Sequence, residues 1–198
     1  MEILLKPQSK KRDAIIRATL QLAAVKGING TSTALIAEKA QTAEVTIFRH
    51  FKTKELLLHT IFDEELENFQ EFIMMGHDES LPIKDRFFAL CSKALQYFWD
   101  NPLTLSFVEQ YMHIPLGWER RPDMRYHPGE QFEDFPFIHL LVGGISKKEI
   151  KALAIPSLTG MVFGALGSSA REYHLKGLQN DPPNIDALIE ACWDAVKR

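Results

Sequence analysis

Apolar residues recur every three or four positions along nearly the whole chain, which is the period of an α-helix and not of a β-strand. The clearest stripe lies near the end of the sequence and consists of Ile185, Leu188, Ile189, Cys192, Trp193 and Val196. Another stripe over residues 10–26 stops at Gly27, a residue type that commonly ends helices. Since 45% of the 198 residues are apolar, the chain can bury a core. We therefore expect an all-α fold.

Two short helices separated by a tight turn are expected to follow the first helix. The hydroxyls of Thr31, Ser32 and Thr33 can cap a helix that runs through Ala40. The stretch "QTAE" then interrupts the pattern, and residues 45–51 form another short helix. This arrangement is typical of a helix-turn-helix, whose second helix lies in the major groove of DNA.

The second short helix carries groups that bind base edges or phosphates. Thr46 offers a hydroxyl and a methyl group, Arg49 can bind guanine or a phosphate, and His50 can donate to backbone oxygens. Glu44 is an acid near the expected groove, although its carboxylate could accept from cytosine. These side chains indicate a surface that reads DNA, but they are also compatible with a solvated face of a helical bundle.

The inward side of this helix and the two lysines that follow it can also be predicted. Either Val45, or Ile47 together with Phe51, could pack inward. Lys52 and Lys54 bracket the start of the next helix, where free backbone N–H groups and the positive helix end favour a phosphate. We expect the short helix to read bases and the two lysines to hold the DNA backbone.

The charge distribution supports a polyanionic partner at one end of the chain. Residues 1–60 hold ten Lys and Arg against five Asp and Glu, whereas the remaining residues hold 13 against 21, within a net charge of -3. A cationic end of this kind suits DNA, an acidic protein or a membrane surface.

Residues 15–57, "IIRATLQLAAVKGINGTSTALIAEKAQTAEVTIFRHFKTKELL", resemble the DNA-binding region of TetR-family transcriptional regulators. The match includes the glycine that ends the first helix, the Thr/Ser before an Ile-Ala pair, "VTIFRHF" for the family's "GTLYHYF", and the "KELL" restart. The closing stretch "GLQNDPPNIDALIEACWDAVKR" is similar to the last helix of many such regulators. Three positions depart from the family pattern: Gln41 replaces a turn glycine, Ala43 a capping serine and Phe48 a phosphate-bonding tyrosine.

The resemblance implies a regulator, and we expect a repressor, that binds a palindromic operator in double-stranded DNA as a homodimer and is released by a small-molecule effector. It implies a three-helix helix-turn-helix domain over residues 1–52, and a helical ligand-sensing and dimerisation domain over residues 53–198. The candidate DNA-binding residues are Thr31, Ser32, Thr33, Ala43, Glu44, Thr46, Phe48, Arg49, His50, Lys52 and Lys54.

An aromatic-rich region is the candidate sensor. Residues 97–137 hold ten of the twenty aromatic residues, beside an irregular stretch over residues 114–136 that could move to admit a ligand. The candidate ligand-binding residues are Phe98, Trp99, Phe107, Tyr111, Trp118, Phe132 and Phe135. We expect an apolar or aromatic ligand, whose carboxylate, if it has one, could meet Arg120, Arg121 or Arg125. Any single aromatic residue here could instead belong to the core.

A small-residue face is the candidate dimer interface. Gly160, Gly164 and Ser168 recur every fourth residue and would let another helix approach closely. We expect them to form the interface together with Ile189 and Trp193 of the last helix. The alternative is a contact within one chain.

Other classes of protein have little support in the sequence. We find no convincing paired acids, metal-ligand spacing, nucleophile elbow or phosphate loop, so we expect no enzyme, cofactor or metal. A helical-bundle enzyme, or a ligand-binding protein without DNA binding, remains the alternative. Cys91 and Cys192 read as buried thiols, and the uncharged residues 152–170 as a buried helix, not a membrane span. The apolar patch in "MEILLKPQSKKR" is too short for a signal peptide, so we expect a cytoplasmic protein.

Overall fold

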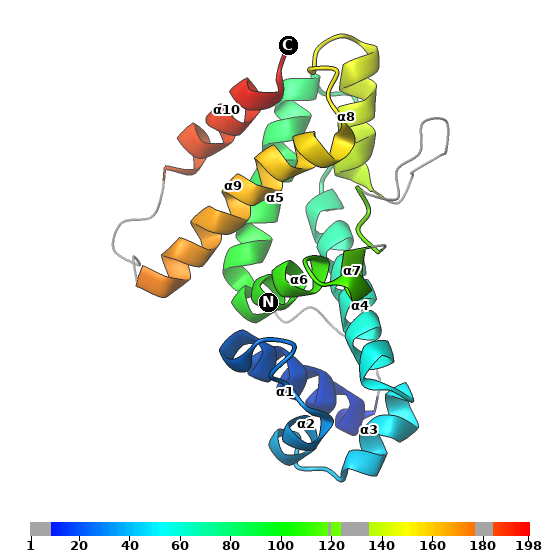
Figure 1. Ribbon diagram of the computed structural model, residues 1–198. Coiled ribbons are helices and arrows are strands. Elements are labelled where there is room, and N and C mark those ends of the chain that lie inside the picture. Colours follow the sequence, from blue (N-terminus) through cyan, green and yellow to red (C-terminus); the bar gives the residue numbers. More distant parts are fainter. Residues whose placement is uncertain (1–8, 119, 124–134, 177–183) are drawn as a thin grey trace. The chain divides into compact units, whose positions relative to one another are not determined.

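The computed structural model describes residues 9–118, 120–123, 135–176 and 184–198, and this part of the chain is all-α (Figure 1). The predicted fold class and the first helix over residues 10–26 are confirmed. In chain order, the helices are α1 (Lys10–Lys26), α2 (Thr33–Lys39), α3 (Glu44–Phe51), α4 (Lys54–Met74), α5 (Ile83–Asp100), α6 (Pro102–Met112), α7 (Pro115–Trp118), α8 (Pro136–Ser146), α9 (Ile155–Lys176) and α10 (Ile185–Val196).

The chain divides into two compact units. The first comprises Met1–Asn68 with Leu103–Glu119, and the second comprises Phe69–Pro102 with Arg120–Arg198. The functional boundary expected between residues 52 and 53 therefore falls inside the first unit. This unit also contains α6 and most of α4.

The core of the first unit joins the three N-terminal helices to α4 and α6. Ile15 of α1, Ile36 of α2 and Ile47 of α3 are fully buried in one cluster with residues from the two later helices. Within it, Tyr111 of α6 stacks on Phe62 of α4 with 4.7 Å between the ring centres. Helices as short as α2 and α3 are marginal in isolation, so this packing supplies most of their stability.

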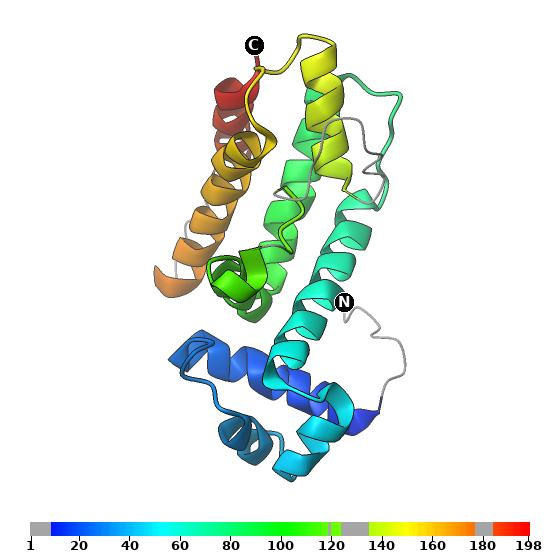
Figure 2. The same ribbon diagram turned by 45° about the vertical axis from the view of Figure 1, so that its right-hand side comes forward.

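The second unit is built from α5, α8, α9 and α10 with the end of α4. Figures 1 and 2 show these four helices side by side, and α5 packs against each of the other three. Phe87 of α5 lies 5.2 Å from the Trp193 ring of α10 and 5.6 Å from the Phe137 ring of α8. These aromatic contacts between three helices form the centre of the unit's core.

Two further expectations about the core can be compared with the structure. Cys91 and Cys192 are buried free thiols, and burial raises the pKa of each above its ordinary value, which makes both poor nucleophiles. Of the uncharged residues 152–170, residues 155–170 belong to α9, whose inner side is buried at Leu158, Val162 and Leu166. Among the described residues, no helix is long and apolar enough to cross a membrane.

Candidate nucleic-acid interface

The turn between α2 and α3 contains a non-glycine residue in a left-handed backbone conformation. Gln41, which stands where a turn glycine is usual, has a φ of 51° and is therefore in the left-handed region. A non-glycine residue pays about 1 kcal/mol or more for this conformation. Ala43 precedes α3 as its N-cap and makes no side-chain capping bond there, whereas Ser32 caps α2 by accepting from the Leu35 N–H at 3.3 Å.

The two sides of α3 differ sharply in burial. Ile47 is fully buried and Phe51 is 4% exposed, so these two residues, and not Val45, face the core. Successive helical residues are about 100° apart, which places Val45 and Arg49 opposite this buried side with Thr46 next to them. Val45 is 72% exposed and Arg49 is also exposed. The outward ridge of α3 is therefore a valine and an arginine one turn apart.

Phe48 and His50 flank this ridge on its two sides. Phe48 is 43% exposed, and His50 is half-buried with its ring 6.1 Å from that of Phe51. Phe48 has no hydroxyl, so it offers an apolar ring edge where a tyrosine would offer a donor.

Thr33 and Glu44 bind one another across the turn. The Thr33 hydroxyl donates to a carboxylate oxygen of Glu44, which ties the start of α2 to the start of α3. Both residues were predicted to contact DNA. In this arrangement the hydrogen bond between them helps to orient α3, and the Glu44 carboxylate points toward α2.

Thr31 has a different position from the one expected for a DNA contact. Its side chain is 1% exposed, and its hydroxyl donates to the Gly27 carbonyl at 2.8 Å. The buried hydroxyl therefore stabilises the connection between α1 and α2, and the side chain is not free for the DNA contact predicted from the sequence. Ser32, the next residue, is exposed.

Lys54 likewise serves the fold. Its Nζ donates to the Ile28 carbonyl at 3.0 Å, and the side chain is half-buried. At the start of the same helix, the Thr53 hydroxyl accepts from the Leu56 N–H at 3.1 Å. The expected phosphate site thus has fewer free donors than the sequence indicated. Lys52, which is exposed and has a φ of 62°, is the lysine left to meet a phosphate.

Glu55 adds a negative charge at this helix end. Hydrogen bonds from its own backbone N–H and from Thr53 lower the pKa of its carboxyl, so the group is ionised at neutral pH. A carboxylate in the first turn of α4 competes with a phosphate for the positive helix end.

Gln110 of α6 is a structural residue that the sequence did not reveal. Its Oε1 accepts from the Ile28 N–H at 3.0 Å, and its Nε2 donates to the Ala23 carbonyl at 3.1 Å. Together with Lys54, it satisfies both backbone groups of Ile28. An amide on an amphipathic helix carries no signal of such a long-range contact.

We expect Lys54→Ala to lower the free energy of unfolding by about 1 kcal/mol, because the Ile28 carbonyl loses its charged donor and keeps the Thr31 N–H at 3.2 Å. Lys52→Ala is the matched control, since its exposed side chain should leave stability within about 0.5 kcal/mol. Urea denaturation of the two variants and the wild type measures the difference. Equal stability of the two variants would contradict the assigned role of Lys54.

The candidate ligand-binding residues are divided between the two units. Phe107 and Tyr111 are fully buried in the core of the first unit, so their burial is explained by packing. Trp118 of the same unit is 57% exposed. Phe98, Trp99 and Phe135 belong to the second unit and are half-buried, whereas Phe132 lies outside the described residues.

Two surface hollows lie elsewhere. One of about 410 Å³ in the first unit lies beside α1 and the α2–α3 turn, and one of about 260 Å³ in the second unit lies between the end of α4 and α5. Neither is lined by a candidate ligand-binding residue.

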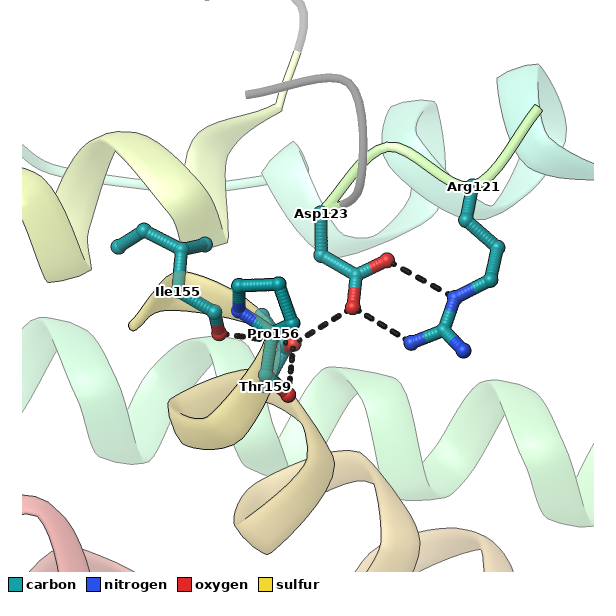
Figure 3. Close-up of polar contacts among 5 residues, drawn as sticks. All are labelled: Arg121, Asp123, Ile155, Pro156 and Thr159. Carbon is teal, nitrogen blue, oxygen red and sulfur yellow. Dashed lines mark hydrogen bonds and ion pairs between the residues drawn. The ribbon is translucent and has the colours of Figure 1, made fainter. Parts of the chain in front are cut away.

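Arg121 is paired within the chain (Figure 3). Its Nε and Nη2 donate to the two carboxylate oxygens of Asp123 at 3.2 and 2.7 Å, and the Thr159 hydroxyl donates to Oδ2 at 3.1 Å. Asp123 and Thr159 are both buried. This network fastens residues 120–123 to the first turns of α9, so Arg121 is engaged by Asp123 and is not a free partner for a ligand carboxylate.

The predicted dimer residues separate into two groups. Gly160, Gly164 and Ser168 are exposed along one side of α9, and a Cβ added to either glycine would meet nothing within 4 Å. Ile189 and Trp193 are buried within the second unit, where Trp193 packs against Phe87. Their side chains pack in the core of the second unit, whereas the α9 face is exposed, so α9 is the better candidate for the predicted interface.

Two family models match the sequence. "Bacterial regulatory proteins, tetR family" matches residues 15–61, and "Tetracyclin repressor-like, C-terminal domain" matches residues 82–197. An uncharacterized HTH-type transcriptional regulator of Haemophilus influenzae is 28% identical over 193 residues, which are 94% of this chain and 95% of that protein.

Solved structures show the same fold. A TetR-family transcriptional regulator from Haemophilus influenzae has a TM-score of 0.76 at 20% identity, covering 95% of this chain and 99% of that one. A TetR-family transcription regulator from Marinobacter aquaeolei has a TM-score of 0.75 at 19% identity, covering 95% of this chain and 96% of that one.

Proposed function

The chain belongs to the TetR family of bacterial regulatory proteins and is a helix-turn-helix transcriptional regulator, and we propose that it represses transcription from a palindromic operator until a small ligand releases it. In this proposal the protein binds double-stranded DNA as a homodimer, and α3 enters the major groove. The first unit supplies the DNA contacts, and the second supplies the dimer interface and the effector site.

The outward ridge of α3 is the observation that carries the proposal. Ile47 and Phe51 anchor the helix in the core, and Arg49 and Val45 project away from it. Arg49 can bind O6 and N7 of guanine, and Thr46 beside it can bind a base or a phosphate. A helix held rigidly by its inner side, with Arg49 and Thr46 among its outward side chains, suits recognition better than catalysis.

Selection of duplexes from a random-sequence library by the full-length protein tests this function. We expect a two-fold symmetric consensus with half-sites about one helical turn apart. Affinity for the selected duplex should fall steeply between 50 and 200 mM salt, because lysines and arginines displace counterions. Absence of any enriched sequence, with no salt-dependent binding, would contradict the proposal.

The exposed side of α9 supports the homodimer. Glycine in the middle of a helix costs about 0.5–1 kcal/mol relative to alanine, and two of them lie on this side with open space above their Cα atoms. A second copy of α9 could approach closely there. A two-fold axis between the copies would explain a palindromic operator.

An effector site in the second unit is supported by a partly open aromatic group. Phe69 stacks parallel to Phe98 at 5.4 Å, and Phe163 lies 6.0 Å from Phe69. Nearby in sequence, the indole Nε1 of Trp99 is buried and has no hydrogen-bond partner among the described residues. An unpaired buried N–H costs about 1–3 kcal/mol, so a ligand with an apolar body and one acceptor oxygen would suit this region.

Effector and operator must weaken each other by the same factor, typically about 1–3 kcal/mol. A screen of apolar and aromatic compounds for those that raise the melting temperature and also release the selected operator tests the sensor. We expect Trp99→Phe to weaken such a ligand without changing operator affinity. If every stabilising compound left operator binding unchanged, the sensor proposal would be wrong.

A further inference from the structure

Val45 presents an apolar side chain at the centre of the proposed DNA-reading surface. At 72% exposure it is among the most exposed large apolar residues in the described part of the chain, and its ridge partner Arg49 is a cation. Phe48, 43% exposed, extends this apolar area on one side. Single exposed apolar residues are common on proteins, but here the side chain lies where a helix would meet base edges.

The chemistry of the major groove offers one apolar group to such a side chain. Among the groups that the four bases display there, the C5-methyl of thymine is the large apolar one, whereas the same position of cytosine carries only a hydrogen atom. A cytosine at the same place would present only a C5–H to the valine, and its amino group would stand where thymine has O4. The valine would then lose the apolar contact with a methyl group. Val45 should therefore favour thymine over cytosine.

We propose that Val45 is a specificity-determining residue that contacts the methyl group of a thymine in each half-site, beside the guanine bound by Arg49. The proposal rests on the proposed operator-binding function. Four residues of helix rise about 6 Å, which corresponds to about two base-pair steps when the helix lies along the groove. The thymine and the guanine should thus lie within about two base pairs of each other.

Removal of the thymine methyl group tests the contact without changing base pairing. Each thymine of the selected operator is replaced in turn by deoxyuridine, and affinity is measured for the wild type, Val45→Ala and Val45→Thr. At one thymine position, present in both half-sites by symmetry, the replacement should lower wild-type affinity about fourfold per half-site. This is the loss expected for one buried methyl-sized group. Val45→Ala should bind thymine and deoxyuridine at that position equally, while Val45→Thr, which keeps one methyl group, should retain part of the discrimination.

The other thymines of the operator serve as matched controls, since their replacement should affect the wild type and Val45→Ala alike. Because Val45 is largely exposed, circular dichroism and melting temperature should be the same for all three proteins. If no thymine shows the methyl effect, or if Val45→Ala retains it in full, the inference is overturned while operator binding stands. A wild-type protein that selects no operator overturns the proposed function itself.

Discussion

Gly164→Leu should convert the protein to a monomer and lower its affinity for the selected operator by about 100-fold or more. The expected loss is large because a dimer binds its second half-site as an intramolecular event, which typically contributes a factor of 10² to 10⁴. Within the described part of the chain, a Cβ at Gly164 has nothing within 4 Å. A bulky side chain there would, however, hold a second α9 away.

The same substitution should not harm the fold of the monomer. Glycine is about 0.8–1 kcal/mol less favourable than alanine inside a helix and leucine ranks just below alanine, so α9 itself should become more stable. Sedimentation velocity would give the association state, and circular dichroism would give the helix content. Gly143→Leu in α8 is the matched control, because it also has open space at its Cβ and lies outside the proposed interface. A dimeric Gly164→Leu protein with normal operator binding would place the interface elsewhere.

The local features of the helix-turn-helix could be predicted because they depend on residues close in sequence. The bounds of α1 follow from its apolar stripe and Gly27, and the strained turn follows from Gln41 in place of glycine. The side of α3 that faces the core was left open, since Val45 and Ile47 are equally apolar. Only the packing of α3 against the other helices distinguishes the two.

Other features of the candidate site could not be predicted because they depend on contacts between residues far apart in sequence. Lys54 and Gln110 both bind Ile28, and neither partner could be identified from spacing within a helix. Tyr111 appeared to belong to an aromatic ligand site because it is close in sequence to other aromatic residues. In the structure its ring packs in the core of the first unit. Closeness in sequence was therefore a poor guide to a shared site, because α6 belongs to the first unit whereas Phe98 and Trp99 of α5 belong to the second.

Burial also distinguishes an apolar helix stripe that faces the core from one that faces a second subunit. Trp193 belongs to the clearest amphipathic pattern in the sequence, and such a stripe can face either the core or a second subunit. Its contact with Phe87 assigns it to the core. The α9 glycines show the opposite case, because small residues leave no apolar signature and only their exposure marks the surface as available.

Arg49→Ala should lower affinity for the selected operator by about 1–3 kcal/mol, roughly 5- to 150-fold, and should relax the preference for guanine at one position of each half-site. The guanidinium can donate two hydrogen bonds to O6 and N7 of guanine, and alanine can donate none. Since Arg49 is exposed on the outward ridge of α3, the fold should be unaffected. A repeated selection with the variant would show whether that position has lost its consensus base.

Lys52→Ala is the matched comparison for Arg49→Ala, because it tests a phosphate contact where Arg49→Ala tests a base contact. An exposed lysine that contacts a phosphate carries no sequence information, so its loss should weaken binding to all duplexes about equally and reduce the salt slope by about one. The two variants should thus differ in kind, because one loses specificity and the other loses affinity alone. If Arg49→Ala instead weakened specific and random duplexes by the same factor, Arg49 would be a phosphate contact, and Val45 and Thr46 would be left to read the bases.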